Sequence, residues 1–193
     1  MRRQAELMPT FIGALPVHVL VVHAVVVLVP LSVLGAIVVS LWPAARRRYG
    51  WLVVGVAVVA TACIPIATSS GEGLEHRLPR TPLLEVHTHL GDQLLVFVAG
   101  MLVFLVAFTV IHQRAGTLGR REGPGTMTGP AAPPRLAGPM RIVAGVLAAL
   151  TVVLAVVSAV QVYRIGDSGA TAAWSGRQYV TQSPGPRPGG AAG

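Results

Sequence analysis

The sequence predicts an all-α membrane protein: a bundle of four transmembrane helices with a flexible cytoplasmic linker and a disordered C-terminal tail. Hydrophobic residues make up 53% of the 193 residues and charged residues only 11%, whereas a typical soluble domain is about 25% charged. Four apolar runs are each long enough to cross a bilayer as a helix, which takes about 20 residues. The runs are continuous rather than alternating, which favours helices over strands.

The composition excludes several other classes of protein. A single cysteine, Cys63, excludes an intrachain disulfide framework and a cysteine-cluster metal site. All 15 basic residues are arginines, but they are scattered between the apolar runs without a nucleic-acid-binding motif. We therefore expect the lipid bilayer as a partner and no nucleic acid. The exclusive use of arginine in a chain rich in Ala, Val and Gly indicates a GC-rich bacterial genome.

Shifts in composition divide the chain into three parts. We expect an N-terminal segment at 1–15, a four-helix transmembrane domain at 16–180 and a disordered tail at 183–193. The four helices are expected at about 16–42, 51–70, 82–112 and 141–164. No internal repeat is evident, although the first and third helices both open with Pro followed by His.

The first helix is expected to open at Pro16, because proline is favoured in the first turn of a helix. Its apolar run is too long for a signal peptide and carries two histidines, so we expect a retained transmembrane helix. The segment Gln113–Met140 is rich in Gly and Pro, which indicates a flexible linker. The tail is also rich in Pro and Gly, which indicates disorder.

The placement of arginine predicts the orientation. The loops after the first and third helices carry eight Arg and one acidic residue, whereas the other side carries seven Arg and six acidic residues. Because basic residues accumulate in cytoplasmic loops, both termini are expected outside the cytoplasm. These observations predict a multi-pass protein of the bacterial inner membrane.

The ionisable residues gather at the predicted outer face, where five of the six histidines and four carboxylates lie. At 1.5 Å per residue, His23 and Asp92 each lie about 30 Å above the inner ends of their helices, and His18 and His89 about 35 Å. These levels match in space if the first and third helices are neighbours. The sixth histidine, His112, is expected to cap the inner end. Ionisable groups at membrane depth are costly and are functional candidates.

Spacing ranks the candidate ligands. Glu85, His89 and Asp92 lie at i, i+4 and i+7, so they form one stripe on the third helix. His18 and His23 are five residues apart and diverge by about 140° on the first helix. Greater depth favours His23 as the inward ligand, with His18 second. We expect His23, His89 and Asp92 to face one another.

These residue types favour a metal or haem site. Neutral imidazole binds zinc, copper or iron, and a carboxylate either joins the metal or orients an imidazole. The candidate metal ligands are His18, His23, His89, Glu85 and Asp92. A haem would take one or two axial histidines from the first and third helices. Arg77 and Arg80 are the candidates to pair with its propionates.

The opening segment LPVHVLVVH at 15–23 carries a Pro-x-His motif with a second His five residues later. It resembles the start of a bacterial family of predicted membrane proteins catalogued as domain of unknown function 2231, which has four apolar spans. The segment Gly166–Ala170 is similar to the closing motif of that family. The resemblance implies a multi-pass bacterial membrane protein and no established activity. The histidines that match the family pattern are His18, His23 and one of His87 and His89.

Three functions follow as hypotheses. The first is a membrane protein that binds haem or a transition metal near the outer face for redox chemistry or electron transfer, with a membrane redox partner or a second copy of the chain. The second is a non-catalytic scaffold or partner subunit whose polar cluster is structural. The third is a metal or proton sensor or a transporter component, which the apolar inner half disfavours.

Overall fold

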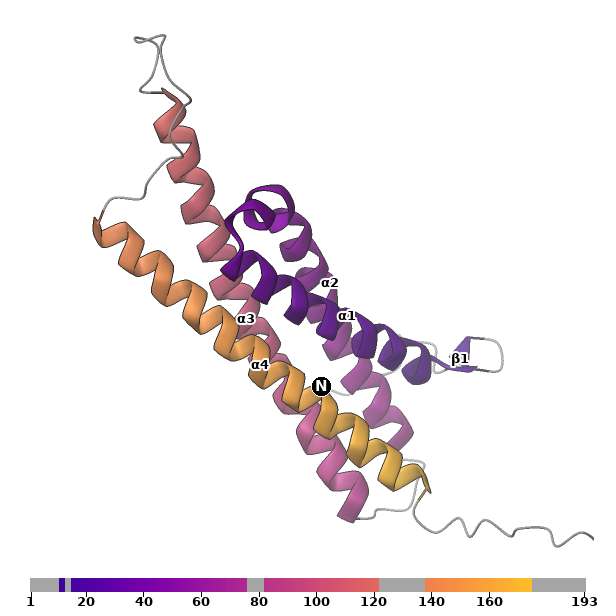
Figure 1. Cartoon of the computed structure of the whole chain (residues 1–193). Helices are drawn as coiled ribbons and strands as arrows, with labels where there is room; N and C mark the ends of the chain where they lie inside the picture. The colour runs from indigo at the N-terminus through magenta and orange to yellow at the C-terminus, as the bar shows by residue number, and fades with distance from the viewer. Residues whose placement is uncertain (1–10, 13–14, 76–81, 122–137, 175–193) are drawn as a thin grey trace, which may run out of the picture.

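A computed structural model describes residues 11–12, 15–75, 82–121 and 138–174. Four long helices lie side by side in a bundle (Figure 1). They are α1 (Val17–Leu41), α2 (Pro43–Glu75), α3 (Pro82–Arg121) and α4 (Gly138–Trp174). Before α1, the two-residue strands β1 (Phe11–Ile12) and β2 (Leu15–Pro16) pair in antiparallel fashion. The predicted four-helix bundle is confirmed.

All four helices contain a span long and apolar enough to cross a membrane. Their outward faces carry large apolar side chains such as Val27, Val96 and Ile142, which are 63%, 70% and 70% exposed. Lipid solvates such side chains, and a helix leaves no unpaired backbone group within the bilayer. The chain is therefore a multi-pass membrane protein whose helices contact the lipid bilayer.

Three helices extend beyond the apolar runs that predicted them. α2 begins at Pro43 instead of residue 51, α3 continues to Arg121 into the segment interpreted as a linker, and α4 runs from Gly138 to Trp174. Adding a turn to an existing helix costs little free energy, because the unfavourable nucleation of the helix has already taken place. Hydropathy therefore locates the part of a helix inside the bilayer and misses the part outside it. The predicted tail and the rest of the linker lie outside the described residues.

The helices form two similar hairpins, α1–α2 and α3–α4, a correspondence that is not evident in the sequence. Each hairpin packs most extensively within itself, and the two hairpins meet through α1–α4 and α2–α3. Val29 of α1 corresponds to Val98 of α3, 69 positions later, and both are fully buried. Ala57 of α2 corresponds to Ala155 of α4, 98 positions later, and both are again fully buried. The two hairpins therefore share a pattern of helix packing and of buried positions.

The same two offsets relate buried positions whose side chains have diverged. Ala36 corresponds to Leu105 and Ala60 to Ser158, and all four are fully buried. The two hairpins therefore share the positions of their buried residues but not the residues themselves, so comparing residue identities along the sequence does not reveal the correspondence. The arrangement places α1 and α3 diagonally across the bundle, with α2 and α4 as the neighbours of each.

Candidate functional site

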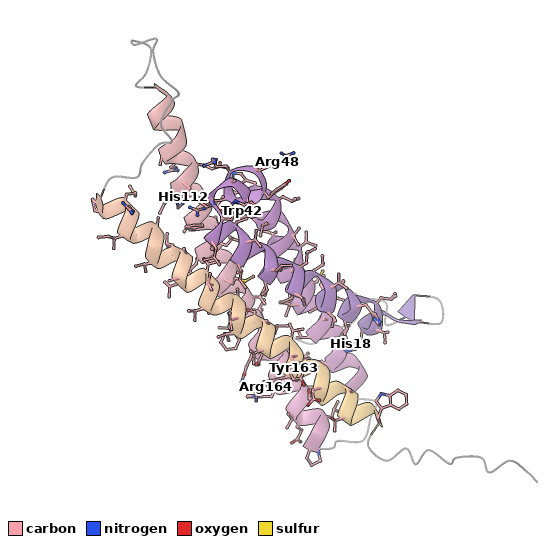
Figure 2. The ribbon with its side chains drawn as sticks, viewed as in Figure 1. His18, Trp42, Arg48, His112, Tyr163 and Arg164 are labelled. Atoms are coloured by element: carbon pink, nitrogen blue, oxygen red, sulfur yellow. The ribbon has the colours of Figure 1, made fainter. Side chains whose placement is uncertain are left out.

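A cavity of about 500 Å³ lies between the helices at the end of the bundle where α1 begins. All four helices contribute to its wall, and most of the lining side chains are apolar or glycine. His18 of α1 and His87 of α3 line it from diagonally opposite helices. Figure 2 shows His18 at this end of the bundle, with Trp42 and His112 near the other end.

The imidazole of His18 is held by α2. Its Nδ1 lies 2.9 Å from the carbonyl oxygen of Ala67 and 3.3 Å from Oγ of Ser70, and the Ser70 hydroxyl donates to the same carbonyl at 3.0 Å. Because a carbonyl oxygen only accepts, Nδ1 carries the proton, and Nε2 of the neutral ring carries a lone pair. The ring packs on Gly71, where a Cβ would lie 2.9 Å from His18 Cε1. Any larger residue at position 71 would displace the ring.

The imidazole of His87 is held by α4 in the same way. Its Nδ1 lies 3.2 Å from Oγ of Ser168, whose hydroxyl donates to the carbonyl of Ile165 at 3.0 Å. With the serine proton donated to Ile165, Oγ accepts from Nδ1, and the lone pair of the neutral ring again lies on Nε2. The ring packs on Gly169, where a Cβ would lie 3.0 Å from His87 Cε1.

The two histidines occupy equivalent positions in the two hairpins. His18 and His87 are 69 positions apart, and the Ser-Gly pair beside one is 98 positions from the pair beside the other. Neither Nε2 has a hydrogen bond to any residue that the structure describes. With both rings neutral, the site offers two nitrogen lone pairs beside one cavity, one from α1 and one from α3.

The cavity has a polar edge where α2 meets α3. Glu72 and Asp92 line it with exposed carboxylates, and Thr68 and Thr88 add hydroxyl groups. The two helices are close here, because a Cβ at Gly91 would lie 4.0 Å from the Thr68 methyl group. The wall formed by α1 and α4 is apolar apart from His18. A ligand in this cavity would therefore meet one polar edge and one apolar edge.

Two of the five predicted metal ligands, His18 and Asp92, line the cavity. Glu85 is exposed on α3 and is not part of the lining. Within the described ranges, no group of three or more His, Cys, Asp or Glu side chains is arranged to hold a metal ion. Arg77 and Arg80 lie outside the described residues, so their pairing with propionates stays a prediction.

His23 and His89 are exposed and bond within their own helices. His23 Nδ1 donates to the carbonyl of Val19 at 2.6 Å, and His89 Nδ1 lies 3.2 Å from Nε2 of Gln93. Depth favoured His23 over His18, but the angle between the two decides their roles. A separation of about 140° around α1 turns one ring inward when the other faces outward.

The family resemblance leaves His87 and His89 as alternatives, whereas the candidate metal ligands include only His89. The serines that hold the two rings are not among the residues that the sequence indicates. The stripe of Glu85, His89 and Asp92 favours the face of α3 that carries His89. His87 lies about 160° around the helix from His89. The signal that finds His87 is the offset of 69 positions from His18, together with the Ser-Gly pair that each following helix carries. That offset becomes evident only once the helices are aligned by their buried positions.

Residues 14–182, which include all four helices, match the family of predicted membrane proteins described as DUF2231. The chain belongs to this family. The resemblance carried by the opening histidine motif is thereby confirmed. No curated protein and no solved structure matches the chain. Membership of DUF2231 supports the multi-pass assignment and brings no activity with it.

The opposite end of this DUF2231 protein holds a histidine in a structural arrangement. His112 Nδ1 donates to the carbonyl of Phe108 at 3.0 Å, and His112 Nε2 accepts from the guanidinium of Arg46. Arg46 also donates to the carbonyls of Val39 and Ser40, at 3.0 and 3.1 Å, and lies 4.5 Å from the centre of the Phe108 ring. It thereby caps α1 and ties α2 to α3. Both ring nitrogens of His112 are engaged, in contrast to those of His18 and His87.

Proposed function

We propose that this protein binds a redox-active metal centre between His18 and His87 and exchanges electrons with a partner at one face of the membrane. The observation that carries the proposal is the pair of equivalent imidazoles, each bonded through Nδ1 and each with an unprotonated Nε2 beside one cavity. An imidazole whose Nδ1 proton is donated to a carbonyl or hydroxyl oxygen is oriented to ligate a metal through Nε2.

The Nε2 atoms support the same conclusion. Neither has a hydrogen-bond partner among the described residues, and a metal ion between the rings would meet both lone pairs at once. Imidazole ligates iron, copper and zinc, and iron and copper are redox-active.

The position of the cavity makes the centre accessible from one side. His87 stands 25 residues from His112 along α3, which is about 37 Å and exceeds the roughly 30 Å of the hydrocarbon core. The partner therefore meets the centre at the His87 end. Arg46, Arg47 and Arg48 lie at the other end, which the positive-inside rule assigns to the cytoplasm. We accordingly propose a bacterial inner-membrane protein with the site and both termini on the outer side.

The test is metal analysis and absorption spectroscopy of the protein purified in detergent. We expect a metal or haem in a ratio of one per chain in the wild type, and loss of that metal in His18→Ala and in His87→Ala. His23→Ala is the matched control, since its ring is exposed and bonds only within α1. A wild type that takes up neither metal nor haem, or a His23→Ala variant that loses as much as His87→Ala, would contradict the proposal.

One observation favours a structural role as the second candidate. The Nδ1 bonds of His18 join α1 to α2, and that of His87 joins α3 to α4, so both rings contribute to helix packing without any ligand. Interhelical hydrogen bonds in membranes are each worth about 0.6 kcal/mol on average. A metal-free wild type whose unfolding temperature falls in His18→Ala and His87→Ala would identify the protein as a scaffold.

A further inference from the structure

Building on the proposed metal centre, we infer that the group held between His18 and His87 is a haem, with one imidazole on each face of a planar macrocycle. The sequence leaves haem and a bare transition-metal ion as alternatives. Three features of the cavity separate them: the number of ligands, their symmetry and the glycines behind the rings.

The number of ligands favours a macrocycle. A bare zinc or copper ion takes three or four protein ligands. Within the described ranges the chain gathers no group of three or more His, Cys, Asp or Glu side chains that could hold an ion. Haem iron already has four equatorial nitrogens and needs only one or two axial ligands from the protein. Two imidazoles are therefore a complete set of axial ligands for haem.

The symmetry of the site matches the two axial positions. Axial ligands approach iron from opposite faces of the macrocycle. His18 and His87 come from diagonal helices and occupy equivalent positions in the two hairpins. Both rings have the same tautomer because each is held by a Ser-Gly pair on the following helix. Equivalent ligands on opposite sides of one cavity are suited to bind a planar macrocycle between them.

The glycines beside the two imidazole rings leave space between the rings for the macrocycle. With no Cβ at Gly71 or Gly169, each ring packs closely against the helix that holds it. A Cβ would lie 2.9 Å from His18 Cε1 or 3.0 Å from His87 Cε1, so the ring would have to move away from that helix. Gly91 and Gly166 also line the wall. A cavity of about 500 Å³ falls in the ordinary range of about 300–1,000 Å³ for sites that bury small ligands.

The experiment titrates the metal-free chain in detergent with hemin and, separately, with Zn²⁺. We expect one haem per chain with the absorption spectrum of six-coordinate low-spin iron. Gly71→Ala and Gly169→Ala should each weaken haem binding at least tenfold. Gly55→Ala and Gly145→Ala are the matched controls on the same two helices, because a Cβ there meets nothing within 4 Å, and they should bind haem as the wild type does.

The outcomes separate this inference from the proposal beneath it. Binding of Zn²⁺ through His18 and His87 without binding of hemin would overturn the haem assignment and leave the metal centre standing. Binding of neither would overturn both. Haem affinity unchanged in Gly71→Ala and Gly169→Ala would also refute the inference. A His87→Gly variant guards against misfolding as an explanation, since added imidazole should restore its low-spin spectrum if the fold is intact; failure to restore it in a folded variant would count against haem.

Discussion

The hydroxyl group of Ser168 orients the His87 ring, and its removal should weaken metal or haem binding more than removal of the equivalent hydroxyl of Ser70. In Ser168→Ala, His87 loses the 3.2 Å bond between its Nδ1 and the Ser168 hydroxyl. In Ser70→Ala, His18 keeps the 2.9 Å bond to Ala67, which is shorter than the 3.3 Å bond that it loses. The two variants therefore remove bonds of unequal importance from equivalent positions.

The size of the effect follows from the energies of such bonds. A hydrogen bond contributes about 0.5–1.5 kcal/mol net. We expect about 1 kcal/mol for Ser168→Ala, or roughly fivefold in affinity, and about 0.5 kcal/mol for Ser70→Ala, or roughly twofold. Competition titration of the purified variants measures both. Ser69→Ala is the control, because that exposed hydroxyl bonds only to Ile66 of its own helix. A loss in Ser70→Ala that exceeds the loss in Ser168→Ala would refute the reasoning.

Three further predictions concern packing and topology. Arg46→Met removes charged hydrogen bonds at the end of α1 and should lower the free energy of unfolding by about 2 kcal/mol. Arg47 is exposed, so Arg47→Met should leave it unchanged. Thermal unfolding in detergent compares the two variants, and equal melting temperatures would contradict the role of the Arg46 guanidinium. Gly35→Ala places a Cβ 2.9 Å from a valine methyl group of α2 and should cost about 1–3 kcal/mol, whereas Gly55→Ala should cost nothing, as unfolding curves would show. Thr171→Cys should react with a membrane-impermeant thiol reagent added to whole cells, and protection from the reagent would reverse the proposed orientation.

The sequence was sufficient for the fold because continuous apolar runs leave few alternatives in a membrane. All four helices fall where hydropathy placed them, and the errors lie at their ends. Residues 43–50 and 113–121 are helical without being apolar, because their backbone hydrogen bonds extend a helix that the membrane segment already stabilises. Hydropathy carries no information about that continuation.

The site was predictable in its location but not in its geometry. Of the five histidines that the structure describes, four lie at one end of the bundle, near the starts of α1 and α3. Which of them turn inward depends on the rotation of each helix about its own axis, and α1 carries valines on all sides, so no apolar stripe fixes that rotation. His23 was preferred for its depth, whereas packing selects His18. The equivalence of His18 and His87 becomes visible when the helices are aligned by their buried positions, and those positions are known only from the packed structure.

The most direct test of the account is X-ray absorption spectroscopy at the edge of the bound metal, which counts imidazole ligands. The account predicts two imidazoles on the metal in the wild type and in His23→Ala, and the loss of that pair in both His18→Ala and His87→Ala. A metal without imidazole ligands, or one whose two imidazoles persist when His87 is removed, would contradict it.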